Sequence, residues 1–148
     1  TYRKMGEDVV DKAAAHAGLP RKESLTVSLR IHGYREDVDH GDPLYWYGSD
    51  LDQIKAMAGR EPELGRTISE RIPLIAAQVA WAVRKEMART LEDCLARRIR
   101  AIQLDARECV RIAPEVAAIM AAELGRDKAW QKEQVEAFTS LAQKHIIN

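Results

Sequence analysis

The chain has 148 residues, enough for one domain with its own core and too few for a complete nucleotide-binding domain joined to a substrate domain. Its 23 basic residues balance its 23 acidic residues, so no net charge attracts it to nucleic acid or to an anionic membrane. No apolar run approaches the roughly 20 residues that span a bilayer, and no signal-peptide pattern opens the sequence. These features predict a soluble, cytoplasmic protein that does not bind nucleic acid.

The first part of the sequence contains one helical pattern and one segment of alternating polarity. Apolar residues at helical spacing predict a first helix, which Gly18 and Pro20 end. In residues 25–32 apolar and polar residues alternate, which is the period of a half-buried strand. A lone strand leaves its backbone groups unpaired, so this segment is either irregular extended chain or a strand whose partner lies outside these residues. We favour the second alternative. The sequence also starts at Thr1 inside a helical pattern, which suggests a piece of a longer protein.

Aromatic and turn-forming residues separate this part from a long helical region. Their clustering over residues 33–48 predicts a loop packed by its own side chains. From residue 49 onward, helical periodicity and capping signals predict a bundle. We therefore expect an all-α fold of about five to seven helices. An N-terminal portion over residues 1–48, with an extended segment around 25–32, precedes a helical cap domain over residues 49–148.

The strongest local signal lies at residues 90–100. Thr90 is placed to cap a helix, with Asp93 in the position from which an acidic side chain reaches back to the cap. Apolar residues at helical spacing follow, so this stretch predicts the central helix of the bundle. Asp105 and Glu108 repeat the capping pattern before a long apolar stripe.

Two prolines mark further boundaries in the predicted bundle. Pro73 suits the first position of a helix, so a helix is expected to begin there. Pro114 interrupts the stripe after Asp105 and predicts either two helices or one sharp kink.

Catalytic and metal-binding motifs are missing from the sequence. It contains no Gly-rich phosphate loop, no paired histidine motif and no Gly-flanked serine. The four histidines match no metal-ligand spacing, so no metal site is expected. Cys94 and Cys109 are predicted to be buried free thiols of a protein in a reducing compartment. The tryptophans and the Tyr45–Tyr47 cluster are interpreted as packing residues and not as a surface on which bases stack.

Basic residues are dense in the middle of the predicted bundle. The arginines concerned are Arg97, Arg100, Arg107 and Arg111. If their helices are neighbours, these guanidinium groups form a patch able to bind a carboxylate or phosphate of a substrate or other anion. The alternative is a set of salt bridges with the acids Glu86, Glu92, Asp93, Asp105 and Glu108. We favour the salt bridges, because the acids are equally dense in the same stretch.

An ordered set of segments runs through nearly the whole sequence. It comprises Thr1-Tyr2-Arg3-Lys4-Met5 with Asp8 and Val9, Leu29-Arg30-Ile31-His32-Gly33-Tyr34, Trp81-Ala82-Val83-Arg84, Glu86-Met87-Ala88-Arg89-Thr90-Leu91-Glu92-Asp93, Leu95-Ala96-Arg97-Arg98, Leu104-Asp105-Ala106-Arg107, Met120-Ala121-Ala122-Glu123-Leu124-Gly125 and Trp130. In this order the segments resemble the C-terminal region of FAD-dependent glycerol-3-phosphate dehydrogenases. One departure is that Ala76 and Ala77 stand where relatives often carry polar or acidic residues.

The resemblance implies a flavoprotein of glycerol metabolism as the parent protein. Such an oxidoreductase oxidises glycerol 3-phosphate to dihydroxyacetone phosphate, passes the hydride to FAD and delivers the electrons to a quinone. In this family the flavin and most substrate-binding residues belong to the larger N-terminal region. The chain is therefore expected to be a non-catalytic cap fragment that binds no cofactor by itself.

The resemblance also implies partners and one cofactor residue. Thr1 would lie at the start of a helix whose positive end faces the flavin. The implied partners are the parent's own N-terminal FAD domain and, through the parent, a quinone and the inner face of a membrane; homo-oligomer formation is left open. The alternative function is a stand-alone helical protein-interaction module with a basic arginine face.

Overall fold

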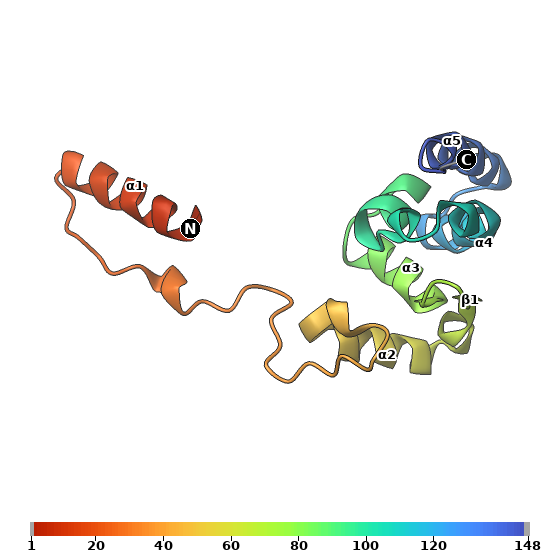
Figure 1. The fold of residues 1–148 in the computed structure, drawn as a ribbon, viewed down its shortest axis with the longest axis horizontal. Coiled ribbons are helices and arrows are strands. Elements are labelled where there is room, and N and C mark those ends of the chain that lie inside the picture. Colours follow the sequence, from red (N-terminus) through yellow and green to blue (C-terminus); the bar gives the residue numbers. More distant parts are fainter. Residues whose placement is uncertain (1, 147–148) are drawn as a thin grey trace. The chain divides into compact units, whose positions relative to one another are not determined.

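The computed structural model describes residues 2–146. The chain divides into two compact units, one extending to Glu36 and the other beginning at Asp37. Helices predominate, and the described residues contain only two short strands (Figure 1). The predicted all-α class is therefore confirmed. The predicted domain boundary after residue 48 stays a prediction, since the compact units are divided by chain contacts and not by domain function.

The unit before Asp37 consists of one helix and a mostly irregular chain. Helix α1 (Tyr2–His16), red in Figure 1, has no buried residue. The helix ends at His16, and Gly18 follows with a φ of +66°, in the left-handed region that glycine adopts without strain. In this chain Leu25–Val27 forms a 3₁₀ turn and no strand follows in this segment, so a strand whose partner lies outside these residues stays a prediction. Without a partner strand, extended backbone cannot pair its polar groups.

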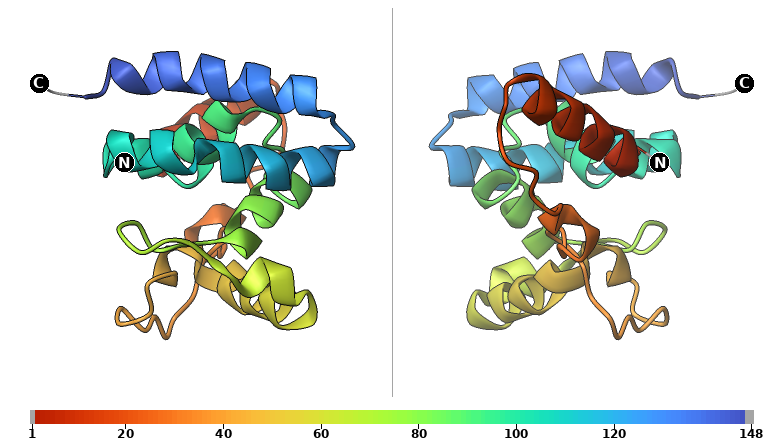
Figure 2. Two further views of the ribbon diagram at one scale, coloured as in Figure 1. Left: turned by 90° about the vertical axis from the view of Figure 1, so that its right-hand side faces the viewer. Right: turned by 90° about the vertical axis from the view of Figure 1, so that its left-hand side faces the viewer.

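The unit from Asp37 onward is built on four α-helices. They are α2 (Leu51–Arg60), α3 (Ala76–Arg84), α4 (Ala106–Leu124) and α5 (Lys128–Gln143). The chain turns at Gly125, where φ is +62°, and α5 packs along α4 (Figure 2). Helix α3 packs against α4 and against α2. Short 3₁₀ segments lie at Tyr45–Asp50, Pro62–Gly65 and Ala101–Gln103.

Helix α3 is the centre of the core of this unit. Every residue from Ala76 to Val83 is buried. Four of these eight residues are alanines, whose small side chains allow neighbouring elements to approach closely. Ile54 of α2 and Phe138 of α5 belong to the same apolar cluster, so the core extends continuously from α2 to α5.

A small hairpin precedes α3. Strand β1 (Thr67–Ser69) pairs antiparallel with β2 (Leu74–Ile75), with a register irregularity within β1. The prediction that Pro73 opens a helix is therefore wrong, and α3 begins at Ala76. The backbone N–H of Ile75 donates to the side-chain oxygen of Gln78 at 2.8 Å, which holds the junction between strand and helix.

The segment predicted as the central helix is capped as expected but coiled differently. The hydroxyl of Thr90 accepts the N–H of Asp93 at 3.1 Å, and the Asp93 carboxylate accepts the N–H of Thr90 at 3.1 Å. Asp93–Arg98 then forms a π-helix, in which the N–H of Ile99 donates to the carbonyl of Cys94 at 2.9 Å. This wider turn keeps Cys94 and Ile99 together on the buried side. The predicted helix over this stretch is thus present, as a π-helix and not as a regular α-helix, and its capping is confirmed.

Three further predictions concern the capping of α4, Pro114 and the aromatic loop. Asp105 caps α4 by accepting the N–H of Glu108 at 2.9 Å, as predicted. Pro114 lies inside one continuous helix, so the two-helix alternative is wrong. In the aromatic loop Tyr47 is buried, and the rings of Tyr45 and Trp46 pack edge-on with their centroids 5.9 Å apart. The loop is therefore packed by its own side chains, as expected.

Candidate functional site

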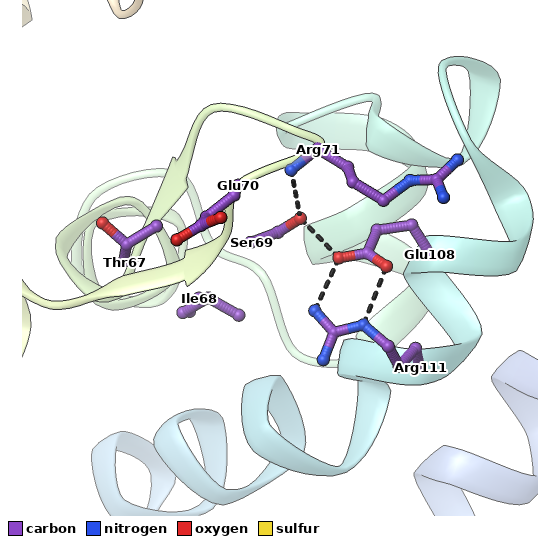
Figure 3. Close-up of a pocket in the computed structure, with 7 residues that line it drawn as sticks. All are labelled: Thr67, Ile68, Ser69, Glu70, Arg71, Glu108 and Arg111. Atoms are coloured by element: carbon purple, nitrogen blue, oxygen red, sulfur yellow. Dashed lines mark hydrogen bonds and ion pairs between the residues drawn. The ribbon is translucent and has the colours of Figure 1, made fainter.

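A polar cluster joins the β1–β2 hairpin to α4 and borders a cavity of about 360 Å³ (Figure 3). At its centre the hydroxyl of Ser69 donates to the Glu108 carboxylate at 2.5 Å. The Arg111 guanidinium donates to both oxygens of that carboxylate, at 2.6 and 2.8 Å. Glu108 is only 6% exposed, and the Arg111 guanidinium paired with it neutralises its charge.

The local sequence around Ser69 explains why this residue reaches α4. Its oxygen accepts the backbone N–H groups of Arg71 and Ile72, each at 3.2 Å, which stabilises the tight turn of the hairpin. The Arg71 side chain donates to Asp105, the cap of α4, at 2.6 Å. The hairpin is thus fixed to the first turn of α4 by one buried and one exposed polar contact.

The electrostatics of Glu108 exclude a proton-transfer role near neutral pH. Hydrogen bonds from Arg111 and then Ser69 lower the pKa of Glu108 to about 2, so the group is a carboxylate at all ordinary pH values. A general acid or base needs a pKa near the working pH. The cluster therefore acts as a structural tie between the hairpin and α4. Sequence reasoning assigned Glu108 to a capping box, but its side chain bonds Ser69 and Arg111 instead.

The two cysteines are buried, as predicted. Burial raises the pKa of the Cys94 thiol, and burial together with Asp105 raises that of Cys109 to about 12. Neither thiol is a nucleophilic thiolate at neutral pH. Among residues 2–146 no group of histidine, cysteine and acidic side chains could hold a metal ion.

The predicted arginine patch lies among acidic side chains. Arg97 donates to Glu92 at 2.6 Å and to Asp93 at 2.7 Å. Arg100 follows the π-helix with a φ of +61°, and Arg107 lies in the first turn of α4. These contacts give Arg97 two of the salt bridges that the favoured alternative required. Anion binding by Arg97, Arg100 and Arg107 stays a prediction.

Two other expectations concern Thr1 and membrane-spanning helices. Thr1, the predicted cofactor residue, lies outside the described residues. Within residues 2–146 no helix combines the length and the hydropathy needed to cross a membrane.

Comparison with known proteins identifies relatives of this chain. Residues 31–133 match the family model described as the C-terminal domain of alpha-glycerophosphate oxidase. A glycerol-3-phosphate dehydrogenase of Synechocystis is 35% identical over 117 residues, covering 66% of the chain and 21% of that protein. The mitochondrial glycerol-3-phosphate dehydrogenase SDP6 of Arabidopsis thaliana is 28% identical over 167 residues, covering 92% of the chain and 26% of that protein.

A probable mitochondrial glycerol-3-phosphate dehydrogenase of Caenorhabditis elegans is 28% identical over 157 residues, covering 92% of the chain and 22% of that protein. The chain thus spans about a quarter of the length of these curated relatives, from 21% to 26%. No solved structure matches the chain.

Proposed function

Because this chain belongs to the family of the C-terminal domain of alpha-glycerophosphate oxidase, we propose that it serves as the non-catalytic cap of an FAD-dependent glycerol-3-phosphate dehydrogenase. The full enzyme oxidises glycerol 3-phosphate to dihydroxyacetone phosphate and delivers the electrons to a quinone. The FAD accepts the hydride when it is bound. The observation that carries the proposal is the family match over residues 31–133. In addition, the similar dehydrogenases are about four times longer than the region that they share with this chain.

The difference between the two compact units supports this division of labour. The unit from Asp37 contains a continuous core, and most of it lies within the family match over residues 31–133. The unit before it contains α1, which buries none of its residues. An amphipathic helix gains stability by burying its apolar face, so α1 needs a partner outside its own compact unit. The N-terminal flavin domain is that partner.

The residues described here suit the edge of a flavin site and not a complete one. The sequence has no Gly-rich phosphate loop, so the dinucleotide must be held elsewhere in the enzyme. The first turn of α1 contains Arg3 and Lys4 and no acidic residue, so the positive end of its dipole is not neutralised there. We propose Thr1 as the residue next to the flavin, because the resemblance to FAD-dependent glycerol-3-phosphate dehydrogenases implies this position. Its part is to present a positive helix end toward negative charge on the reduced ring.

The arginines of the middle segment have a supporting part in the proposed enzyme. Arg97 is already paired with Glu92 and Asp93, which favours a role in holding the cap together. Arg100 and Arg107 remain candidates for contact with an anionic substrate or with the N-terminal domain.

The proposal is tested by comparing the 148-residue chain with the full-length gene product. We expect the full-length protein to show flavin absorbance and to reduce a dye with glycerol 3-phosphate, and the chain alone to do neither. Bound flavin with turnover by the chain alone would contradict the assignment of chemistry to the N-terminal domain. A full-length gene product without a dinucleotide-binding motif would favour the stand-alone interaction module instead.

A further inference from the structure

The segment after α1 exposes four apolar side chains at alternate positions. They are Leu25, Val27, Leu29 and Ile31, with exposed fractions of 84%, 70%, 64% and 74%. Polar residues occupy the positions between them, as in a strand with one apolar and one polar face. Scattered single apolar side chains are normal on a surface, but a run with strict period two indicates a face that is buried in the working protein.

The present conformation of this segment includes one short 3₁₀ turn and one tight turn. Ser24 caps the Leu25–Val27 turn by accepting the N–H of Thr26 at 3.3 Å. A turn at Gly33, whose φ is +87°, closes the segment, with the N–H of Tyr34 donating to the carbonyl of Ile31 at 3.1 Å. A single 3₁₀ turn of this kind is short and weakly bonded, so it can become extended when a partner strand supplies backbone hydrogen bonds.

We propose that residues 25–31 become a β-strand added to a sheet edge of the flavin-binding part of the full-length enzyme. The apolar side chains of Leu25, Val27, Leu29 and Ile31 face the interior of that domain. Thr26, Ser28 and Arg30 face outward. This inference rests on the proposed function, and it names the sheet edge as the element that this chain completes. The backbone bonds give binding, and the alternating side chains fix the register.

Helix α1 supports the same partner, the flavin-binding part of the full-length enzyme. It exposes a second apolar face within the same compact unit, at Tyr2, Met5 and Val9, which are 86%, 68% and 67% exposed. A helix and a strand close in sequence, both with an unpartnered apolar face, suit a layer of helices on a sheet. The longer relatives align over 92% of the chain, which includes part of this unit, although the family match begins only at residue 31.

A second copy of the chain is a poorer occupant. Two such segments pairing edge to edge would satisfy backbone groups, but a two-stranded ribbon leaves its apolar face in water and is marginally stable. A sheet that already has its own core covers both the edge and the apolar face. We therefore assign the strand to the preceding domain.

Thiol labelling tests the alternation directly. Single substitutions Val27→Cys, Ser28→Cys, Leu29→Cys and Arg30→Cys are made in the full-length enzyme and in the 148-residue chain, and maleimide labelling is followed by peptide mass mapping. The native Cys94 and Cys109 are buried with raised pKa values, so they add little background. In the full-length enzyme we expect positions 27 and 29 to react roughly 10-fold or more slowly than 28 and 30. In the chain alone all four positions react at similar rates.

Amide hydrogen exchange separates the failure of this inference from the failure of the proposed function. In the full-length enzyme we expect exchange over residues 25–31 to slow on the order of 100-fold relative to the chain alone, and α1 to become protected as well. Protection of α1 without alternating labelling would overturn the strand and leave the flavin-domain assignment standing. Unchanged exchange in both segments, with no flavin in the protein, would overturn both. Concentration-dependent protection in the chain alone would overturn the assignment in favour of a second copy.

Discussion

Two helices of similar amphipathic character behave differently in the two compact units. Met5 and Val9 of α1 are 68% and 67% exposed, whereas Met120 and Val116 of α4 are fully buried. Both helices have apolar residues at helical spacing, so the pattern alone cannot distinguish them. Periodicity predicts that a face will be buried; it does not say whether the burying partner lies in the same stretch of chain. The unit from Asp37 contains its partners, and the unit before it does not.

The largest expected effect compares the same substitution in these two helices. Met120→Ala removes a fully buried side chain from the core, and we expect the free energy of unfolding of the 148-residue chain to fall by about 2–5 kcal/mol. Met5→Ala is the matched control, with an expected change below about 0.5 kcal/mol. Urea unfolding followed by tryptophan fluorescence measures both, because Trp46, Trp81 and Trp130 all lie in the unit from Asp37. A comparable loss in Met5→Ala would break the comparison, because it would show that α1 is buried in the chain alone.

A smaller effect is expected at the polar tie of the second unit. Glu108→Gln keeps the side-chain volume but weakens the contacts with Ser69 and Arg111, so near neutral pH we expect a loss of about 1–3 kcal/mol. Glu115→Gln, in the same helix at an exposed ion pair with Arg66, is the control and should cost about 1 kcal/mol or less.

The same variant predicts a pH dependence with a defined sign. The pKa of Glu108 is lowered from 4.5 to about 2 in the folded chain, so its stabilising contribution is complete above the unfolded value and is lost as the pH falls toward 2. The stability difference between the wild type and Glu108→Gln should therefore shrink between pH 6 and pH 3. A constant difference over that range, measured by urea unfolding at each pH, would show that the charge of Glu108 does not stabilise the tie.

Helix caps give a third test of which unit folds cooperatively. Asp127 caps α5 by accepting the N–H of Trp130 at 2.9 Å, so Asp127→Ala should lower stability by about 1 kcal/mol. Asp127→Asn preserves the acceptor and should behave like the wild type. Ser24→Ala removes the equivalent cap from the 3₁₀ turn before Asp37. Ser24→Ala should leave the main urea transition unchanged. A shift as large as that of Asp127→Ala would show that the two units unfold together as one cooperative structure.

Local sequence signals predicted the features that depend on nearby residues. The caps at Thr90 and Asp105 were correct, because a capping side chain and its N–H partner are three residues apart. The burial of Cys94 and Cys109 followed from apolar spacing. The helical class followed from the periodicity of the whole chain.

Features determined by distant contacts were not predictable in the same way. Ser69 and Glu108 are 39 residues apart, and no motif links them. The two strands of the hairpin contain only five residues together, too few to show a period of two. The clear alternation over residues 25–32 produced no strand in this chain, because a strand depends on a partner and not on its own sequence.

The smallest expected effect concerns the predicted arginine patch. It tests whether these arginines pair with acids of the second unit or bind a group outside it. Arg97 pairs with Glu92 and Asp93, but its side chain is 51% exposed, so Arg97→Ala should lower stability by at most about 1 kcal/mol. Arg97→Lys keeps the charge and is the control. In the full-length enzyme we expect Arg97→Ala and Arg100→Ala to lower the melting temperature more than they alter KM. A large rise in KM for glycerol 3-phosphate with unchanged melting would mean that these guanidinium groups bind the substrate, and that the second unit, like the first, depends on contacts outside itself.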